Sequence, residues 1–338
     1  MVNESSLDIA EVARSIELYL IGKEIHELGK KGVSKLVFTR EPVFRQREEV
    51  SNLVVAAGSY DPLSIAHVSL FRDGLRAAKE SLHSTGLDET LILTCTAHFN
   101  KEVNLRKNAA IYDRVHAQEG FARCEGNVSL AFFNRPLFAD MVDPLKSAYS
   151  NAEISFIVGT DVMQKILDPT GYASIGLDSA KVQEELFTKS RFVVSQRKIS
   201  TPTGDRLVTL NDLQSMYPEC LQYSDRMIPL VLSEMHEGLE IPIEDVSSTL
   251  IRKKRNEDGN IKDLVAVGIS EFVDKRSLYL QDSDKYAAFV CARQRFADAH
   301  VGKPIACYIN ELMNYLVKLD NSSSLREMEV REYGNGRK

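Results

Sequence analysis

The sequence contains no tryptophan, few cysteines, no long apolar run and little net charge. Its five cysteines include no C-x-x-C pair, which argues against a disulfide framework or a zinc site and favours reduced, buried thiols. No stretch of about 18 uncharged apolar residues occurs, so we expect no membrane-spanning helix. A formal net charge of −6 supplies no overall attraction to nucleic acid or to an anionic membrane. Because the N-terminus is acidic and lacks the apolar segment of a signal peptide, we expect a soluble cytoplasmic protein.

The 338 residues suffice for one large domain or two smaller ones, and an apolar fraction of 43% predicts a substantial core. An amphipathic helix is predicted over residues 7–28 from apolar side chains at near-helical spacing. From residue 53, short apolar runs begin to alternate with helix-compatible segments: LVVAA, TLILTCTA, VSLAFF, EISFIVG, RFVVSQR and MIPLVL. Several lack alternation with period two, as strands buried on both faces do. The sequence therefore predicts an α/β fold with a doubly wound parallel sheet, which binds ligands at the carboxyl ends of its strands.

Beyond about residue 280 the sequence predicts helices in SDKYAAFVCARQRFADAH and KPIACYINELMNYLVKL. The second carries an apolar stripe that favours core packing, with a homo-oligomer contact as the alternative. The final segment, DNSSSLREMEVREYGNGRK, is polar and is predicted to fray. We therefore expect a helical extension over 1–50, an α/β domain over 51–280 and a helical extension over 281–338 with a frayed tail.

The segment GSYDPLSIAH begins at Gly58, directly after the first apolar run. A strand, a glycine, a turn and a helix N-terminus form an arrangement that binds phosphate. The glycine lets the backbone approach closely, and the helix N-terminus offers free N–H groups and the positive end of its dipole. His67, near that N-terminus, can donate to phosphate oxygens. Because strand–glycine–helix turns are common, an ordinary loop with a structural histidine is the alternative.

GSYDPLSIAH resembles the G-S-F-D-P-x-H-x-G-H signature of the nucleotidyltransferase superfamily. Its members are Rossmann-like enzymes that move a nucleotidyl group from a nucleoside triphosphate to a phosphate ester. Ser64 stands at the first histidine of the signature and Ala66 at its glycine. A serine hydroxyl is shorter than an imidazole and neutral, so three outcomes are open: a slower enzyme, an enzyme with a compensating cation, or nucleotide binding without turnover. The resemblance implies ATP contacts from Gly58, Ser59, Tyr60, Ser64 and His67.

A second segment, VSSTLIR, lies about 180 residues further along the chain. Ser247, Ser248 and Thr249 suit the N-terminus of a helix that continues through LIRKKRNED, and its hydroxyls and free amides can hold a triphosphate. Arg252, one turn in, can add charge-assisted hydrogen bonds. The alternative is a capped surface helix with a solvated Arg–Lys run. The segment is similar to the superfamily's second signature, I-S-S-T-x-I-R, which implies that these four residues bind ATP and that His67 and Arg252 are catalytic.

Smaller matches indicate one branch, the nicotinamide and nicotinate mononucleotide adenylyltransferases. FIVGTD resembles the branch's G-x-D segment, HFNK its P-H-K loop, and RFVVSQR the strand and arginine that follow. The branch often stacks the pyridine ring on tryptophan, for which Tyr172 is the substitute here. IKDLVAVGISEFVDKRSLY looks like the branch's closing segment. The resemblance implies a further catalytic residue, Lys101, and substrate contacts from Gly159, Asp161, Arg114, Tyr172 and Arg197.

Each smaller match also has a structural alternative. Asp161 could cap a helix, Lys101 could be solvated, and Arg114 could pair with Asp113 or Glu119. The resemblance as a whole implies transfer of AMP from ATP to nicotinamide or nicotinate mononucleotide, with release of pyrophosphate. Mg²⁺ would be carried by ATP, with no metal held by the protein itself. The alternatives are another phosphate-ester acceptor or triphosphate, and a nucleotide-binding regulatory protein without turnover.

Overall fold

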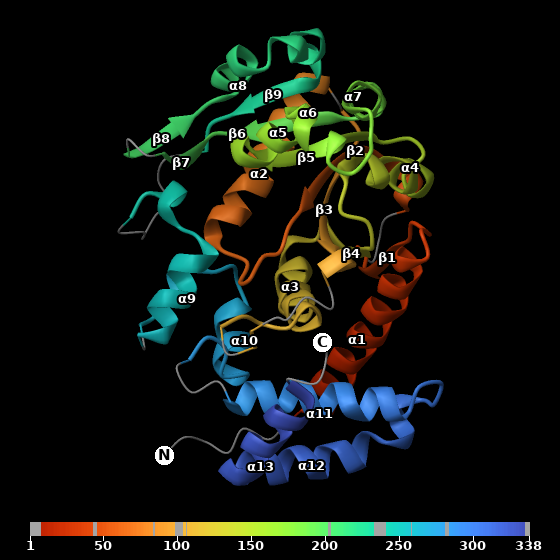
Figure 1. Cartoon of the computed structure of the whole chain (residues 1–338), viewed down its shortest axis with the longest axis vertical. Coiled ribbons are helices and arrows are strands. Elements are labelled where there is room, and N and C mark those ends of the chain that lie inside the picture. The colour runs from red at the N-terminus through yellow and green to blue at the C-terminus, as the bar shows by residue number, and fades with distance from the viewer. Residues whose placement is uncertain are drawn as a thin grey trace.

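The centre of the computed structural model is a seven-stranded sheet with the order β1-β4-β3-β2-β5-β6-β9 (Figure 1). The structure describes residues 8–42, 46–83, 85–98, 104–105, 107–201, 204–232, 241–257, 259–280 and 284–334. The strands of the sheet, in spatial order, are β1 (Leu36–Arg40), β4 (Val128–Phe133), β3 (Leu87–Cys95), β2 (Val50–Ala57), β5 (Glu153–Gly159), β6 (Arg191–Ser195) and β9 (Met227–Leu230). Neighbouring strands are parallel except β1, which is antiparallel to β4.

The six apolar runs of the sequence coincide with β2, β3, β4, β5, β6 and β9, which confirms the predicted α/β sheet. Along β2, Leu53 and Val55 belong to one buried hydrophobic cluster, whereas Val54 and Ala56 belong to another. Successive side chains of a strand point to opposite faces, so both faces of the sheet are covered. A separate two-stranded antiparallel sheet is formed by β7 (Arg197–Thr201) and β8 (Gly204–Val208).

Helices cover each face of the sheet. The cluster that contains Val54 draws on α1 (Ile9–Lys30), α2 (Ile65–Leu82), α3 (Ile111–Glu125), α9 (Ser248–Asn256), α10 (Ile269–Lys275), α11 (Asp284–Ala299) and α12 (Ile309–Asn321). The opposite cluster draws on α4 (Phe138–Ala148), α5 (Thr160–Leu167), α7 (Ser179–Lys189) and α8 (Leu210–Met216). Two short helices, α6 (Pro169–Ala173) and α13 (Ser323–Glu329), complete the set. Within the ranges given above, no helix is long and apolar enough to cross a membrane.

Short turns of helix connect these elements. They are η1 (Arg47–Glu49), η2 (Thr96–His98), η3 (Pro218–Arg226), η4 (Ile243–Asp245), η5 (Lys262–Leu264), η6 (Ile305–Cys307) and η7 (Val330–Gly334). The apolar stripe predicted near the C-terminus lies on α12, where Leu312, Leu316 and Leu319 are fully buried. This burial within the chain agrees with the core-packing interpretation of the stripe.

The N-terminal segment packs on the central sheet, and the C-terminal helices pack on one another and on α1. Figure 1 shows α11, α12 and α13 stacked at one end of the molecule, next to α1, which contacts both α3 and α11. The first 50 residues, predicted as a helical extension, also supply β1 to the sheet. The tail, predicted to fray, is helical to Gly334 because Glu329 is buried against Arg295, with a 3.0 Å ion pair, and accepts a hydrogen bond from Tyr315. The contacts that hold this segment are polar, and fraying of the tail stays a prediction.

The strand order reverses between β2 and β5. From β2 the chain passes to β3 and β4 on one side, and from β5 to β6 and β9 on the other. Doubly wound sheets bind ligands in the crevice outside the carboxyl ends of the strands at such a point. Because β2 and β5 are paired in parallel up to Val55 and Phe156, Gly58 and Gly159 leave the sheet side by side.

Candidate functional site

The loop over residues 58–64 leaves β2 at this crevice and leads into α2. A Cβ at Gly58 would lie 2.6 Å from Cζ of Tyr60, so no larger residue fits beside that ring. Tyr60 has φ +44°, and its buried ring meets the ring of His67 edge-on at 5.1 Å between centroids. The resemblance implies that Tyr60 contacts ATP, which stays a prediction; in the structure its ring lies against Gly58 and His67.

Ser64 caps α2 and holds His67. The serine hydroxyl accepts a hydrogen bond from the His67 N–H at 3.3 Å, and the Ser64 N–H donates to Nδ1 of His67 at 3.1 Å. Because Nδ1 accepts that bond, the Ser64 hydroxyl donates to it at 2.7 Å, and Nε2 carries the ring proton. Ser64 is 0% exposed and therefore does not reach a ligand. This position differs from the ATP contact that the resemblance implies for it. Its role in the structure is to orient the imidazole.

The imidazole of His67 is neutral at physiological pH. Burial, and then the charge of Arg197, lowers the pKa of His67 from its ordinary value to about 4. Burial disfavours the charged imidazolium, and a nearby cation disfavours it further. His67 therefore presents one hydrogen-bond donor, Nε2–H, without a positive charge.

The second signature segment docks on the 58–64 loop. Ser247 caps α9 and accepts a hydrogen bond from the Leu250 N–H at 3.1 Å, as predicted from the run of hydroxyl residues. Ser248 Oγ donates to the Pro62 carbonyl at 2.8 Å, while Arg252 donates to the carbonyl of Asp61 and to Thr249 Oγ1. The two segments therefore meet, although about 180 residues separate them along the chain.

Arg114 connects the start of α3 to the same loop. Its Nη1 donates to Ser59 Oγ at 2.6 Å, its Nη2 lies 3.3 Å from Asp61 Oδ2, and its Nε donates to the Ala109 carbonyl at 2.8 Å. The alternative pairing of Arg114 with Asp113 or Glu119 is therefore wrong. The resemblance implies that Arg114 contacts the mononucleotide, which stays a prediction; in the structure its bonds go to the 58–64 loop and to Ala109.

Two residues of this cluster were missed from the sequence. Asp61 is 5% exposed, and its Oδ1 accepts hydrogen bonds from the Ala109 N–H at 3.1 Å and from the Tyr279 hydroxyl at 2.6 Å. Tyr279 lies just ahead of α11 and is also buried. The available signals were the Asp-Pro pair inside the first signature and the Leu-Tyr pair that ends the closing segment.

Gly159, Asp161 and Arg197 lie together at the end of β5. A Cβ at Gly159 would lie 2.4 Å from Asp161 Oδ1 and 2.9 Å from Arg197 Cγ. Asp161 is exposed in the first turn of α5, which Gly159 rather than Asp161 caps. Burial raises the pKa of Tyr60 and lowers that of His67. The charge of Arg197 opposes the first shift and adds to the second, so the arginine lies near the 58–67 segment. The structure thus brings these three residues together, and their contact with a substrate stays a prediction.

Other predicted residues are not brought into this cluster. Tyr172, on α6, is 7% exposed, so its ring presents no open face for stacking. Lys101 lies outside the described residues, and nothing is inferred from it. Among the residues that the structure describes, no group of three or more His, Cys, Asp and Glu side chains could hold a metal ion.

The assembled site suits an anion. The N-termini of α2 and α9 bring free N–H groups and the positive ends of their dipoles to one loop. Arg252, Arg114 and Arg197 surround that loop, and its one carboxylate, Asp61, is buried and hydrogen-bonded. Such an arrangement can bind the phosphates of a nucleotide and stabilise negative charge that develops on them.

No protein-family model matches the chain. The chain is similar to a Staphylococcus saprophyticus protein named "Probable nicotinate-nucleotide adenylyltransferase", with 27% identity over 150 residues, which cover 41% of this chain and 77% of that protein. It is also similar to the structure of Plasmodium falciparum nicotinic acid mononucleotide adenylyltransferase complexed with APC, with 15% identity and a TM-score of 0.44, over 68% of this chain and 97% of that one. A second structure of that protein, complexed with NaAD, gives 14% identity, a TM-score of 0.44 and the same coverage.

Proposed function

Since this chain belongs to the nucleotidyltransferase superfamily, we propose that it transfers AMP from ATP to nicotinate or nicotinamide mononucleotide and releases pyrophosphate, a step of NAD synthesis. The observation that carries the proposal is the contact between the two signature segments, through Ser248 and Arg252 of α9 and the backbone of Asp61 and Pro62. This contact holds the N-termini of α2 and α9, which form the proposed phosphate site, on the 58–64 loop.

The reaction is an in-line displacement. A phosphate oxygen of the mononucleotide, already anionic at neutral pH, attacks the α-phosphorus of MgATP. The bond from that phosphorus to the bridging oxygen breaks, and magnesium pyrophosphate leaves. No strong general base is required, so catalysis consists of positioning and of stabilising charge on the phosphates.

The residues of the ATP end have distinct roles in this proposal. His67 donates Nε2–H to an oxygen of the reacting phosphate as a neutral group. Ser59 Oγ accepts from Arg114, which leaves the Ser59 O–H free to donate to a second oxygen. Arg252 uses two of its N–H groups on Asp61 and Thr249, and a guanidinium has five, so the remaining donors reach the β- and γ-phosphates.

The acceptor binds at the end of β5 in this proposal. Arg197 lies beside Gly159 and Asp161, and its guanidinium suits either the acceptor phosphate or the carboxylate of nicotinate. The name of the Staphylococcus saprophyticus protein favours nicotinate mononucleotide as the acceptor to be tried first. Tyr172 is not assigned to the pyridine ring, because its own ring is covered.

A second candidate function is nucleotide binding without turnover. It is favoured by Ser64, which is fully buried and occupied with the cap of α2, so that it supplies no donor to a phosphate. Loss of one preorganised donor costs on the order of 10²–10³ in rate in other enzymes. The two candidates differ in whether pyrophosphate is formed at all.

The test is an acceptor panel. The purified chain is incubated with MgATP and nicotinate mononucleotide, nicotinamide mononucleotide or another phosphate ester, and dinucleotide and pyrophosphate are measured. We expect equal amounts of both products with a pyridine mononucleotide. Products only with another ester would favour a different acceptor, and no product while ATP still raises the melting temperature would favour the second candidate.

A pair of variants on α9 links that activity to the site. Arg252→Ala should lower kcat/KM by at least about 10²-fold, because it removes a charge-assisted contact to the phosphates. Lys253→Ala is the matched control, since this neighbouring side chain is exposed on the same helix. Equal kcat/KM for the two variants would contradict the role proposed for Arg252.

A further inference from the structure

A buried ion pair joins α3 to α11. Asp113 of α3 is 0% exposed, and Arg293 of α11 donates to its two oxygens at 2.9 and 2.6 Å. Burial acts to raise the pKa of Asp113, but the charge and hydrogen bonds of Arg293 bring it down to about 2. The pair is therefore ionised and desolvated, and removal of either partner would leave an uncompensated buried charge.

The same helix α11 completes the N-terminal cap of α3. Ala110 is the N-cap residue and has no side chain that can cap. Its N–H donates to the hydroxyl of Tyr286 at 2.7 Å, and that hydroxyl donates to Asp113 Oδ2 at 2.8 Å. In an ordinary capping box the acid three residues on accepts from the N-cap N–H directly. Here the phenol of a distant helix is inserted between the two groups.

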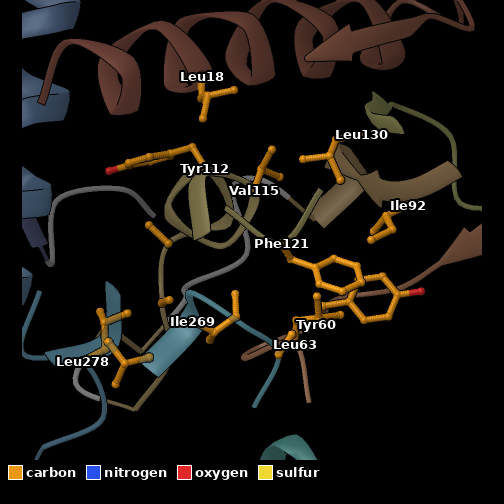
Figure 2. Close-up of a cluster of buried hydrophobic side chains, with 14 of the residues drawn as sticks. Leu18, Tyr60, Leu63, Ile92, Tyr112, Val115, Phe121, Leu130, Ile269 and Leu278 are labelled. Atoms are coloured by element: carbon orange, nitrogen blue, oxygen red, sulfur yellow. The ribbon is translucent and has the colours of Figure 1, made fainter. Parts of the chain in front are cut away.

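The capped turn of α3 is also the turn that holds the 58–64 loop. The Ala109 N–H, adjacent to the one that Tyr286 accepts, donates to Asp61, and Arg114 follows Asp113 in the same turn and donates to Ser59. Figure 2 shows Tyr112 and Val115 of α3 between Leu18 of α1 and Ile269 of α10. The start of α3 is therefore hydrogen-bonded both to α11 and to the loop.

We infer that Tyr286 and Arg293 are positioning residues for nucleotide binding: they set the first turn of α3 and thereby hold Arg114 against Ser59 and Asp61. They touch neither ATP nor acceptor, and act through α3. The inference rests on the proposed function only in that the 58–64 loop binds the phosphates of ATP. Helix α11 thereby supports the nucleotide site without lining it.

The main test is Tyr286→Phe, which removes one hydroxyl and keeps the buried ring. The Kd for MgATP, measured by titration calorimetry, should rise about tenfold, a coupling of the size that links two sites in other proteins. The matched control is Tyr315→Phe, which removes a hydroxyl bonded to Glu329 between α12 and α13. It should lower the melting temperature and leave the Kd unchanged. An unchanged Kd in Tyr286→Phe would overturn the inference.

A measurement on the unaltered chain covers the case in which Tyr286→Phe does not fold. Coupling is reciprocal, so MgATP should slow amide hydrogen exchange in α11 as well as at Ala109 and Ala110. Helix α7, on the opposite face of the sheet, is the internal reference and should show no change. Protection of the 58–64 loop without any in α11 would overturn the inference.

The outcomes separate this inference from the proposed function. Binding of MgATP without formation of any dinucleotide would contradict the proposed function and leave the inference to be decided by the two Kd values. Formation of dinucleotide with equal ATP affinity in the unaltered chain and in Tyr286→Phe would support the proposed function and overturn the inference. Absence of any MgATP binding would overturn both.

Discussion

The helices α2 and α3 both begin beside the 58–64 loop, the proposed nucleotide site, but their N-termini are held in different ways. The cap of α2 is local, since Ser64 and His67 lie within one turn of each other. The cap of α3 is assembled from distant segments: Asp61 holds the Ala109 N–H, and Tyr286 of α11 holds the Ala110 N–H. One N-terminus is thus determined by neighbouring residues in the sequence, and the other by the tertiary fold.

The two N-termini also differ in the role that we propose for them: α2 takes part in the reaction, and α3 supports the 58–64 loop. At α2 the cap itself orients the group that we propose to contact the phosphates, the Nε2–H of His67. At α3 the capping groups are buried, and the side chain of Arg114 reaches the loop. Changes at α2 should therefore act mainly on the reaction, whereas changes at α3 should act first on stability and then on the affinity for nucleotide.

The largest expected effect is at the distant cap. Arg293→Leu should lower the free energy of unfolding by about 3–5 kcal/mol, because it leaves the Asp113 carboxylate buried without its partner. Lys285→Ala, on the same helix, breaks a partly exposed ion pair with Asp320 and should cost about 1 kcal/mol or less. Urea denaturation measures both. Equal losses would contradict the importance given to the buried pair.

The next largest effect is expected at the local cap of α2 and is a change in kcat. His67→Ala should lower kcat by about 10²–10³-fold, because it removes a preorganised donor to the reacting phosphate. The melting temperature should fall much less than in Arg293→Leu, since the imidazole is only partly buried. Steady-state kinetics with MgATP and the best acceptor of the panel, beside a thermal melt, give both values. An unaltered kcat would remove His67 from the mechanism.

A smaller effect is expected from restoring the histidine of the signature. Ser64→His should lower stability by about 1–3 kcal/mol, because an imidazole overpacks a fully buried position and the cap of α2 is lost. It should not raise kcat, contrary to what the signature alone would lead one to expect. Ser64→Ala isolates the loss of the cap, about 1 kcal/mol, and Ser69→Ala within α2 is the neutral control. A gain in kcat for Ser64→His would show that the position reaches the substrate.

The smallest effect is on pH dependence. With the pKa of His67 at about 4, the imidazole stays neutral, so kcat should not change with its titration between about pH 6 and 8. Below the ordinary pKa of 6.5 the unfolded chain binds more protons than the folded one, so this contribution to stability is full above 6.5 and is lost as the pH falls toward 4. His116 has a similarly lowered pKa, so the His67 share is the difference between unaltered chain and His67→Ala. A step in kcat near pH 6.5 would contradict the neutral donor.

Much of the fold was readable from the sequence because its signals are local. The apolar runs predict the parallel strands, and the hydroxyl run at Ser247 predicts the start of α9. The edge strand β1 was missed because five half-buried residues beside a charged segment carry little pattern. Pairing of β1 with β4 depends on contacts about 90 residues apart, which periodicity does not encode.

The candidate site could likewise be predicted only where its sequence signals are local. The signature segments predict that Gly58, His67 and Arg252 share one place, and the hydrogen bonds between α9 and the 58–64 loop agree with it. Nothing local indicates that Tyr279 bonds Asp61 or that Tyr286 caps α3. These partners are separated by 218 and 176 positions along the chain, so only the packed structure defines them.

The proposed reaction is tested most directly by following the α-phosphorus of ATP. The chain is mixed with MgATP labelled at that phosphorus and with nicotinate or nicotinamide mononucleotide, and the nucleotides are separated. We expect the label in the dinucleotide, in an amount equal to the pyrophosphate released, and a loss of that transfer in His67→Ala. Label that remains in ATP, under conditions in which the chain binds MgATP, would contradict adenylyl transfer to a pyridine mononucleotide.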